Sequence, residues 1–440
     1  MPHRPIPPLG EGHAPAGGTL GSDDQSSAPE LLQAAPTTRW PAAFRSLRYR
    51  DFRIFWGGQV ISVIGTWMQH TAQGWLVYQL TNSSLYLGLV GACSAAPMLL
   101  FTLPAGVVAD RCNKRKIVLV TQSLATLQAF GLAALVYTDV VRVWHVMLMA
   151  AALGVINAFD MPTRQSMPLE LVGREDVLNA VSLNSSAFNS GRVIGPTIAG
   201  LLVASAGLGG CFLINAISFV PVVIALAVIR LRPVPKAAGG SMTTHIKEGL
   251  SWVRGQPIAV ALLTLTAVFS VFAMPYATLL PVFARDVFRT GPRGLGFMHS
   301  AYGLGAVTAA LWLAARGHRW RLGALATGGS FLFAIALVAV GWSPEYALAI
   351  LFLFLTGLGL MTFNAVSNTM LQRDPPDELR GRVVSLRVFL FAGFAPLGSL
   401  QIGAMGQWLG PRLAVAISGL VCLATALLAR WRVPALWRKE

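Results

Sequence analysis

Apolar runs without a charged side chain recur along nearly the whole chain, each near the 20-residue length that spans a hydrocarbon core as a helix. A barrel strand would instead alternate apolar and polar residues over about ten positions. The pattern therefore predicts an all-α membrane protein with about twelve transmembrane helices. The predicted spans are 54–78, 85–109, 117–137, 143–159, 178–204, 211–229, 257–283, 295–315, 323–341, 346–366, 384–405 and 411–430.

Composition and charge support this class. The chain is 54% hydrophobic and 12% charged, whereas a soluble domain carries about 25% charged residues. The net charge of +16 would suit nucleic-acid binding, but 27 cations fall in loops and tails on one predicted side and five on the other. The positive-inside rule then predicts a multi-pass plasma (inner) membrane protein with both termini in the cytoplasm and no nucleic-acid partner.

The longest polar interruption, 230–256, divides the spans into two sets of six. Ile246, Leu250 and Val253 recur there at helical spacing, which predicts a short amphipathic helix on the inner face. We therefore predict five segments: a disordered cytoplasmic tail (1–45), an N-terminal six-helix bundle (46–230), a cytoplasmic linker with the amphipathic helix (231–256), a C-terminal six-helix bundle (257–432) and a cytoplasmic tail (433–440).

The two halves also resemble each other in sequence. NAFDMPTRQSMPLELVGREDVLNAVSL aligns with NAVSNTMLQRDPPDELRGRVVSL after a gap of four residues. Such a repeat predicts two pseudo-symmetric bundles that rock about a site between them. Beyond the gap four pairs match at one offset: Ser182 with Ser385, Gly195 with Gly398, Gly200 with Gly403, and Gly207 with Gly410.

The stretch GVVADRCNKRK connects two apolar runs with a cluster of charge. Topology explains its cations but requires no carboxylate. The stretch resembles the loop motif of the major facilitator superfamily at Gly106, Asp110, Arg111, Lys114 and Arg115. Together with RDFRIFWGGQVISVIGTWMQ, WLVYQLTNSS and NAFDMPTRQ, it makes residues 45–430 similar to the branch that contains the enterobactin exporter and macrolide efflux proteins.

This resemblance implies a twelve-helix transporter that works by alternating access, the major facilitator fold. It also implies that Asp110 latches the halves shut on the cytoplasmic side, where we expect it to meet the start of the eleventh span near Arg380 and Arg382. Asn113 stands where the motif usually has a second glycine, so the sequence does not decide how tight this turn is. Gly106 is expected to permit close approach of a neighbouring helix.

The fifth span holds GRVIGPTIAG. Gly191, Gly195, Pro196 and Gly200 resemble the antiporter motif of the same superfamily, which implies exchange transport. A kinked helix selected for packing alone is the alternative.

Arg192 lies within this motif near the middle of the bilayer, where an unpaired cation is costly. It contacts substrate, or it is a structural arginine bonded to helix carbonyls or shielded by water. Arg387, near a span end, is expected to snorkel. The candidate companions of Arg192 are an anionic substrate group and the residues Gln59, Gln69, Gln73, Asn184 and Asn189.

Asp160 and Arg164 follow the fourth predicted span. They form a candidate inner-face gate with Arg380 and Arg382, and helix termination and capping is the alternative for Asp160. No residue is assigned to a proton path.

These observations predict a secondary active exporter of a small, siderophore- or drug-like organic molecule, working in exchange for protons. The chain shows no phosphate-binding loop of Walker type, so we expect no ATP drive. We also expect no enzyme activity, no cofactor and no metal. The expected partners are the bilayer, a small organic substrate and protons, and we expect a monomer. Two alternatives stay open: an importer or facilitator on the same fold, and a membrane sensor that has lost transport.

Overall fold

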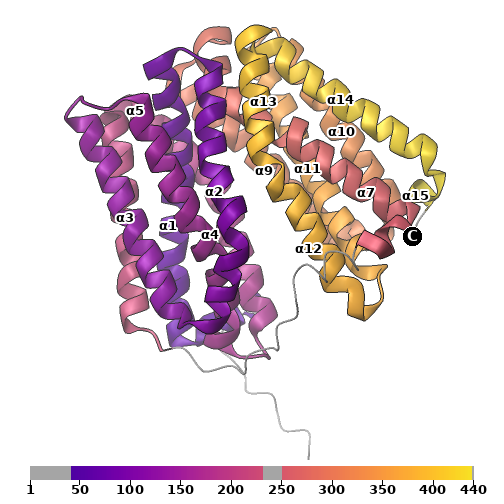
Figure 1. The fold of residues 1–440 in the computed structure, drawn as a ribbon, viewed down its shortest axis with the longest axis horizontal. Helices are drawn as coiled ribbons and strands as arrows, with labels where there is room; N and C mark the ends of the chain where they lie inside the picture. Colours follow the sequence, from indigo (N-terminus) through magenta and orange to yellow (C-terminus); the bar gives the residue numbers. More distant parts are fainter. Residues whose placement is uncertain (1–40, 231–249, 439–440) are drawn as a thin grey trace, which may run out of the picture.

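The computed structural model describes residues 41–230 and 250–438, which form helices and turns without a strand. Residues 1–40, 231–249 and 439–440, which belong to the predicted tails (1–45 and 433–440) and linker (231–256), lie outside the described residues. Figure 1 shows the elements of the first half: η1 (Ala42–Arg48), α1 (Arg50–Thr81), α2 (Ser84–Arg111), α3 (Lys114–Tyr137), α4 (Val143–Val172) and α5 (Val177–Val228). The second half comprises α7 (Pro257–Val268), η2 (Phe269–Ala273), η3 (Met274–Leu279), α8 (Leu280–Val282), η4 (Phe283–Val287), α9 (Gly291–Arg316), η5 (Gly317–Arg319), α10 (Leu322–Trp342), α11 (Tyr346–Arg373), α12 (Asp377–Gly393), α13 (Ala395–Trp408), α14 (Pro411–Arg432) and α15 (Pro434–Arg438).

Ten stretches of the described chain are long and apolar enough to cross a membrane. One of them, α5, has 52 residues and would be about 78 Å long if straight, more than twice a hydrocarbon core. It covers two predicted spans, and its backbone turns between them at Gly207. The first predicted span lies within α1, which is not among the ten. The all-α membrane architecture is confirmed, and the number twelve stays a prediction.

The repeat seen in the sequence also appears in the packing of its glycines. Gly195 and Gly398 each lie against the first helical segments of their own half, α1 and η2–η3 respectively. Gly200 and Gly403 face the opposite half: a Cβ on Gly200 would lie 2.7 Å from the backbone of α9, and one on Gly403 would lie 2.8 Å from that of α2. Small residues at these positions let helix backbones approach each other closely.

Gly207 and Gly410 make the turn that follows in each half, with φ of 73° and 83°. A residue with a Cβ rarely adopts this left-handed conformation, so glycine at both positions has a backbone cause. The two halves therefore share a helix, a glycine turn and a second helix in the same order.

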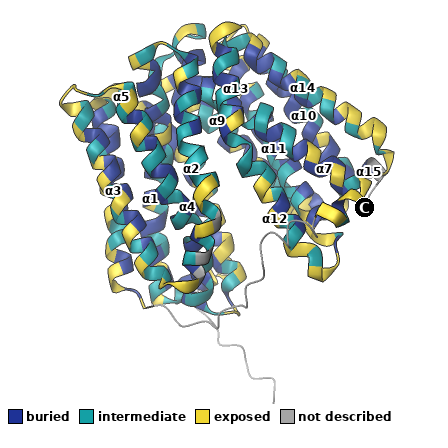
Figure 2. Cartoon of the chain, in the orientation of Figure 1, coloured by how far each residue is buried: buried dark blue, intermediate teal, exposed yellow. Residues whose placement is uncertain are grey.

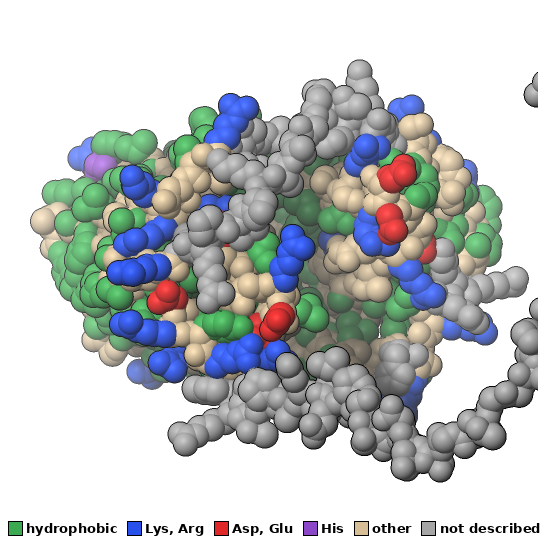
Figure 3. Space-filling view, turned by 90° about the horizontal axis from the view of Figure 1, so that it is seen from below, with side chains coloured by type: hydrophobic (Ala, Val, Ile, Leu, Met, Phe, Trp, Pro, Cys, Tyr) green, Lys and Arg blue, Asp and Glu red, His purple; other side chains and the backbone are tan. Residues whose placement is uncertain are grey.

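The two halves meet along α2 and α13 and along α5 and α9. In Figure 1 the bundles converge at the top and splay apart below. We call the upper end, with residues 82–83, 138–142 and 288–293, the closed end. The lower end, with residues 111–116, 316–321 and 373–382, is called the basic end because many Lys and Arg side chains gather there. Figure 3 views this end and shows a hollow between the halves.

Several boundaries differ from the sequence prediction: α11 continues to Arg373 and α12 begins at Asp377, whereas the predicted spans end at residue 366 and begin at residue 384. Helix α4 continues past the predicted end at residue 159 to Val172, with Pro162 and Pro168 inside it. The predicted tail 1–45 overlaps η1, where the Arg45 Nε atom lies 2.8 Å from the Asp176 Oδ1 atom. The predicted tail 433–440 contains α15, whose Leu436 is buried. In the last three cases, contacts with residues that are distant in sequence stabilise a helix where the sequence alone suggests a boundary.

The outer surface of the bundles is apolar, as a bilayer requires. Figure 2 shows exposed residues along the outward faces of the helices, and large side chains such as Leu127 (65% exposed) and Leu311 (67% exposed) are among them. Of the predicted amphipathic helix, residues 250–254 are described and helical, and Val253 is buried in the core of the second half.

Candidate functional site

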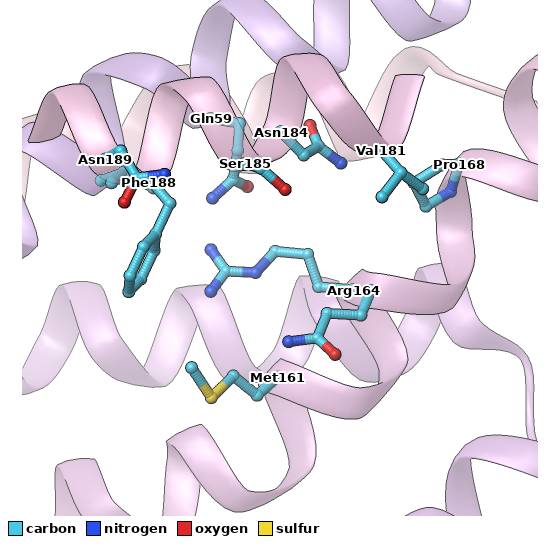
Figure 4. Close-up of a pocket in the computed structure, with 11 residues that line it drawn as sticks. Gln59, Met161, Arg164, Pro168, Val181, Asn184, Ser185, Phe188 and Asn189 are labelled. Carbon is cyan, nitrogen blue, oxygen red and sulfur yellow. The ribbon is translucent and has the colours of Figure 1, made fainter. Parts of the chain in front are cut away.

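A pocket of about 540 Å³ lies in the first half between α1, α4 and α5, and we call it the N-half pocket. Figure 4 shows the Arg164 guanidinium extended into its middle, between Gln59 and Met161 and beside Phe188. Two predicted cavity residues, Gln59 and Asn189, are here, whereas Arg164 was predicted at the inner-face gate. The lining residues are Gln59, Val63, Met161, Arg164, Gln165, Pro168, Val181, Asn184, Ser185, Phe188 and Asn189.

Asp160 holds Arg164 in place from behind the pocket. It is 1% exposed within α4, and its Oδ1 atom accepts hydrogen bonds of 2.9 Å from Thr121 and from Gln122 of α3. Its Oδ2 atom lies 3.1 Å from Arg164 Nε, one helical turn later. The capping alternative for Asp160 is wrong, because α4 does not end there. An ion pair that uses Nε leaves the terminal guanidinium nitrogens free to face the pocket.

Arg192 lies on α5 about 22 Å from the helix start, close to the middle of a bilayer. Its guanidinium carbon is 5.6 Å from the Trp67 ring centroid, 5.9 Å from that of Phe188 and 5.7 Å from that of Tyr302. Tyr302 belongs to α9, so the aromatic surround contains both halves. Within residues 41–230 and 250–438, Arg192 forms no ion pair, and its buried Nε atom has no hydrogen-bond partner.

The other two glutamines predicted to line the cavity, Gln69 and Gln73, lie at different sites in the structure. Gln69 is not a companion of Arg192, because its amide donates to Gln128 at 3.1 Å and accepts from Asn215 at 2.6 Å within the first half. Gln73 lines a second cavity of about 360 Å³ between the halves, which we call the seam pocket. Trp67, His70 and His299 also line this cavity, so Trp67 lies between Arg192 and the seam pocket.

The loop motif fixes the basic end of the first half. The Asn113 side chain caps α3 by accepting from the Lys116 N–H at 3.2 Å, and Asn113 has a negative φ. An asparagine therefore serves this turn, which needs no left-handed glycine. Lys114 pairs with Glu170 at 2.7 Å, and Arg115 donates to backbone carbonyls at the end of α5.

The remaining gate residues lie at the basic end. Asp110 belongs to the last turn of α2, and the exposed Arg111 ends that helix. Arg380 pairs with Asp377 and donates to the Gln372 carbonyl at 2.8 Å, within its own half. Arg382 is half-buried in α12. A Cβ on Gly106 would meet no atom within 4 Å, so the expected close approach at Gly106 is absent from this conformation.

The antiporter-like motif packs helices, and Pro196 introduces no break in α5. A Cβ on Gly191 would lie 2.6 Å from Val63, and one on Gly195 would lie 2.6 Å from Trp67, both in α1. Gly200 and the Pro196 carbonyl approach α9 of the other half. The motif therefore joins α5 to α1 and the first half to the second, and the exchange transport that it implies stays a prediction.

Two features were missed in the sequence. Arg387 does not snorkel: it donates to the Asn364 side chain at 2.8 Å and the Asn368 side chain at 3.3 Å in α11. At the closed end, the Tyr78 hydroxyl bonds Asp286 across the halves, and Arg285 donates to the Tyr78 carbonyl at 3.2 Å. Both contacts join residues more than 15 positions apart, and no local motif signals such pairs.

A profile of the protein family described as transmembrane secretion effectors matches residues 41–439. The staphyloferrin A transporter of Staphylococcus aureus is 27% identical over 380 residues, covering 84% of this chain and 94% of its own. The multidrug efflux pump Tap of Mycolicibacterium fortuitum is 26% identical over 346 residues, covering 76% and 84%. The enterobactin exporter of Shigella flexneri is 25% identical over 381 residues, covering 86% and 90%.

Solved structures share the fold at lower sequence identity. The nucleoside transporter NupG has a TM-score of 0.69 and 14% identity, covering 91% of this chain and 100% of its own. An inward-facing, unoccupied bacterial homologue of the lysosomal transporter Spinster has a TM-score of 0.66 and 14% identity, covering 89% and 96%.

Proposed function

Because the chain belongs to the transmembrane secretion effector family of the major facilitator superfamily, we propose that it exports a small organic molecule from the cytoplasm in exchange for protons. The names of its relatives include siderophore transporters and drug efflux pumps, which supports a siderophore-like or drug-like substrate. The pocket, both halves and the contacts between them lie in one chain, so we expect a monomer to transport.

The direction of the hollow supports this proposal. The positive-inside rule places the basic end in the cytoplasm, together with both termini. The halves touch at the closed end and separate at the basic end, so with this predicted orientation the hollow opens toward the cytoplasm. An inward-facing cavity is the state in which an exporter takes up its substrate, and rocking of the halves would then release it outside.

The N-half pocket is the observation that carries the proposal. Its volume of about 540 Å³ lies in the range of sites for small organic ligands, which is about 300–1,000 Å³. Its walls combine an apolar part with amide groups and one guanidinium, a lining that suits an amphipathic molecule better than a bare ion.

For the coupling proton we propose Asp160. It is a buried carboxylate, and Arg164 connects it directly to the pocket. A proton on Asp160 would remove the charge that faces Arg164, so substrate contact and protonation would influence each other.

The test compares metabolites inside and outside cells that lack or overexpress the gene. An exporter leaves its substrate accumulated inside the deletion strain, and complementation with the wild-type gene restores its loss to the medium. Depletion in the deletion strain would instead indicate the importer or facilitator, and unchanged metabolites across growth conditions would indicate the sensor. Complementation with Asp160→Asn tests coupling: the variant should fold but fail to concentrate substrate outside when a proton gradient is imposed.

A further inference from the structure

The environment of Arg192 raises a question of charge balance. Its guanidinium has five N–H donors, and the described residues provide three aromatic faces but no acceptor for Nε. Aromatic faces attract a cation, but they do not replace the hydrogen bonds lost on leaving water. A charged group without acceptors in the middle of a bilayer is costly, and such residues mark substrate or ion paths.

A second donor without a partner lies on the far side of the Tyr302 ring. The Tyr276 hydroxyl of η3 is buried without a hydrogen-bond partner among the described residues. Its ring packs edge-on against Tyr302 at 5.9 Å, and Tyr302 in turn lies over Arg192. Unsatisfied donors therefore come from both halves of the molecule, and an anionic oxygen would supply the acceptor that Arg192 lacks.

The linings of the two cavities beside Arg192 include one charged side chain, the Arg164 guanidinium, and no acidic one. Arg164 lines the N-half pocket, and His70 and His299 line the seam pocket, while neither lining contains an Asp or a Glu. Phe188 lines the N-half pocket and also faces Arg192, and its ring lies 5.5 Å from Trp67. A ligand with its negative group at Arg192 can therefore extend an apolar body past Phe188 into the N-half pocket.

We propose that the transported molecule is an organic anion with a flat apolar body, and that Arg192 binds its negative group. This inference rests on the proposed export function, since it identifies the chemistry of the substrate of the same pocket. Binding by both halves would also make the anion a contact between the moving parts, because Arg192 belongs to α5 and Tyr302 to α9.

Three probes with one ring system separate charge from shape: 1-naphthoate, 1-naphthamide and 1-naphthylmethylammonium. Binding to the purified full-length protein in nanodiscs is measured by calorimetry. Naphthoate should bind at least about tenfold more tightly than the other two, because it alone supplies an anionic acceptor. Arg192→Gln should remove this preference, and Arg192→Lys should retain part of it, since the charge remains but the planar fork is lost. Arg142→Gln, at the closed end, is the control and should retain all of it.

Equal binding of naphthoate and naphthamide, no naphthoate binding at millimolar concentration, or an unchanged preference in a folded Arg192→Gln protein would each overturn the inference. Thermal unfolding of each unliganded variant checks folding, and the Lys variant replaces Gln if the latter unfolds. The binding assay and the transport assay test the two proposals independently. Anion binding without any efflux would contradict the proposed export, whereas efflux of a cationic or neutral metabolite without anion binding would contradict only this inference.

A different observation concerns the outer face of the second half. An apolar slot of about 530 Å³ lies between α9, α10 and α11, with Thr308 and Thr362 as its polar residues. At about 100° per residue, Thr308 and the seam-pocket residue His299 lie on opposite sides of α9, so the slot faces away from the space between the halves. The Trp312 and Trp320 rings, 6.1 Å apart, form its end.

Arg316 and Arg319 line an adjoining pocket with the same two tryptophans at the basic end. An apolar slot followed by tryptophans and then by arginines matches the order of acyl chain, interface and phosphate in a lipid leaflet. We infer that an anionic phospholipid binds here, with an acyl chain in the slot and its phosphate at the arginines.

Native mass spectrometry of the full-length protein tests this with phosphatidylglycerol and phosphatidylcholine of identical chains. Wild type should retain phosphatidylglycerol several-fold more, and Arg316→Gln/Arg319→Gln should abolish that difference. Arg50→Gln/Arg53→Gln, an equal charge change on exposed positions of the same end, should preserve it. Trp312→Ala should reduce retention of both lipids. Equal retention of the two lipids by wild type, or an equal loss in the control, would contradict a specific site.

Discussion

The closed end and the basic end of the molecule are held together by different means. At the closed end the halves touch backbone to backbone, as a Cβ on Gly403 would lie 2.8 Å from the Gly88 Cα. Few polar groups cross there, among them Ser83 with Gln407 and Tyr78 with Asp286. At the basic end the ion pairs of Lys114 with Glu170 and of Arg380 with Asp377 each lie within one half.

This difference shows how a rocking interface can remain reversible. Contacts between glycines separate without leaving a buried charge, so opening the closed end costs mainly dispersion energy and a few hydrogen bonds. Charge pairs within each half move with that half and do not oppose the motion. The predictions below test which end faces the cytoplasm and how far each end controls the balance of states.

The largest expected effect concerns Cys112, which is exposed at the basic end. In a protein with Cys93, Cys211 and Cys422 replaced by Ser, a membrane-impermeant thiol reagent should label everted vesicles and spare intact cells. The reason is that, by the positive-inside rule, the cations around Cys112 are expected to keep that loop in the cytoplasm. Gel-shift labelling measures the outcome. Labelling of intact cells would mean that the basic end faces outside and the closed end faces the cytoplasm.

A matched pair of glycines should shift the states in opposite directions by about tenfold. Gly88→Val places methyl groups against α13 and should push the closed end apart, which favours the outward-open state. Gly106→Val has free space in the present conformation and should obstruct closure of the basic end, which favours the inward-open state. Spin-label distances across each end measure both effects.

Gly131→Val is the control for this pair, because its surroundings belong to the first half alone. Its distance distributions should match those of wild type. If Gly88→Val and Gly106→Val moved the distances in the same direction, the two ends would not be alternating gates.

Much of the fold follows from sequence because a bilayer imposes a simple rule. Span length and hydropathy place most helix ends within a few residues, and the repeat pairs Gly207 with Gly410, which form the corresponding turns in the structure. Helix α4 shows the limit of this rule. Its apolar signal fades near residue 159, yet tertiary hydrogen bonds to Asp160 carry the helix through two prolines to Val172.

The candidate site was less predictable than the fold. Their positions on one helix suggest that Gln59, Gln69 and Gln73 share one environment. In the structure, however, Gln59 lines the N-half pocket, Gln69 belongs to a buried amide network and Gln73 lines the seam pocket. Neighbouring turns of one helix face different partners, and those partners come from distant sequence. Arg164 was predicted at a gate and lies in a pocket for the same reason, since α4 continues beyond its predicted end.

A smaller effect of about fivefold is expected from one polar contact at each end, corresponding to ~1 kcal/mol. Asp110→Asn removes the charge that we expect to latch the basic end shut, and so should raise the inward-open population. Tyr78→Phe removes the hydroxyl bonded to Asp286 and should lower that population, while its ring stays beside Arg285. Cysteine accessibility at both ends measures the shift. Normal transport with unchanged accessibility in Asp110→Asn would mean that the charged loop serves only to set the membrane topology.

The smallest effect is expected for the exposed contact at the rim of the closed end. The Ser83 hydroxyl donates to the Gln407 side chain at 2.7 Å, but water competes for both groups, so Ser83→Ala should cost at most ~0.5 kcal/mol. The ratio of states should then change by about twofold or less, and transport should stay near normal. The same accessibility assay gives the comparison with Tyr78→Phe, whose hydroxyl belongs to a buried residue. An effect of Ser83→Ala as large as that of Tyr78→Phe would show that the rim, rather than the buried contact, controls opening of the closed end.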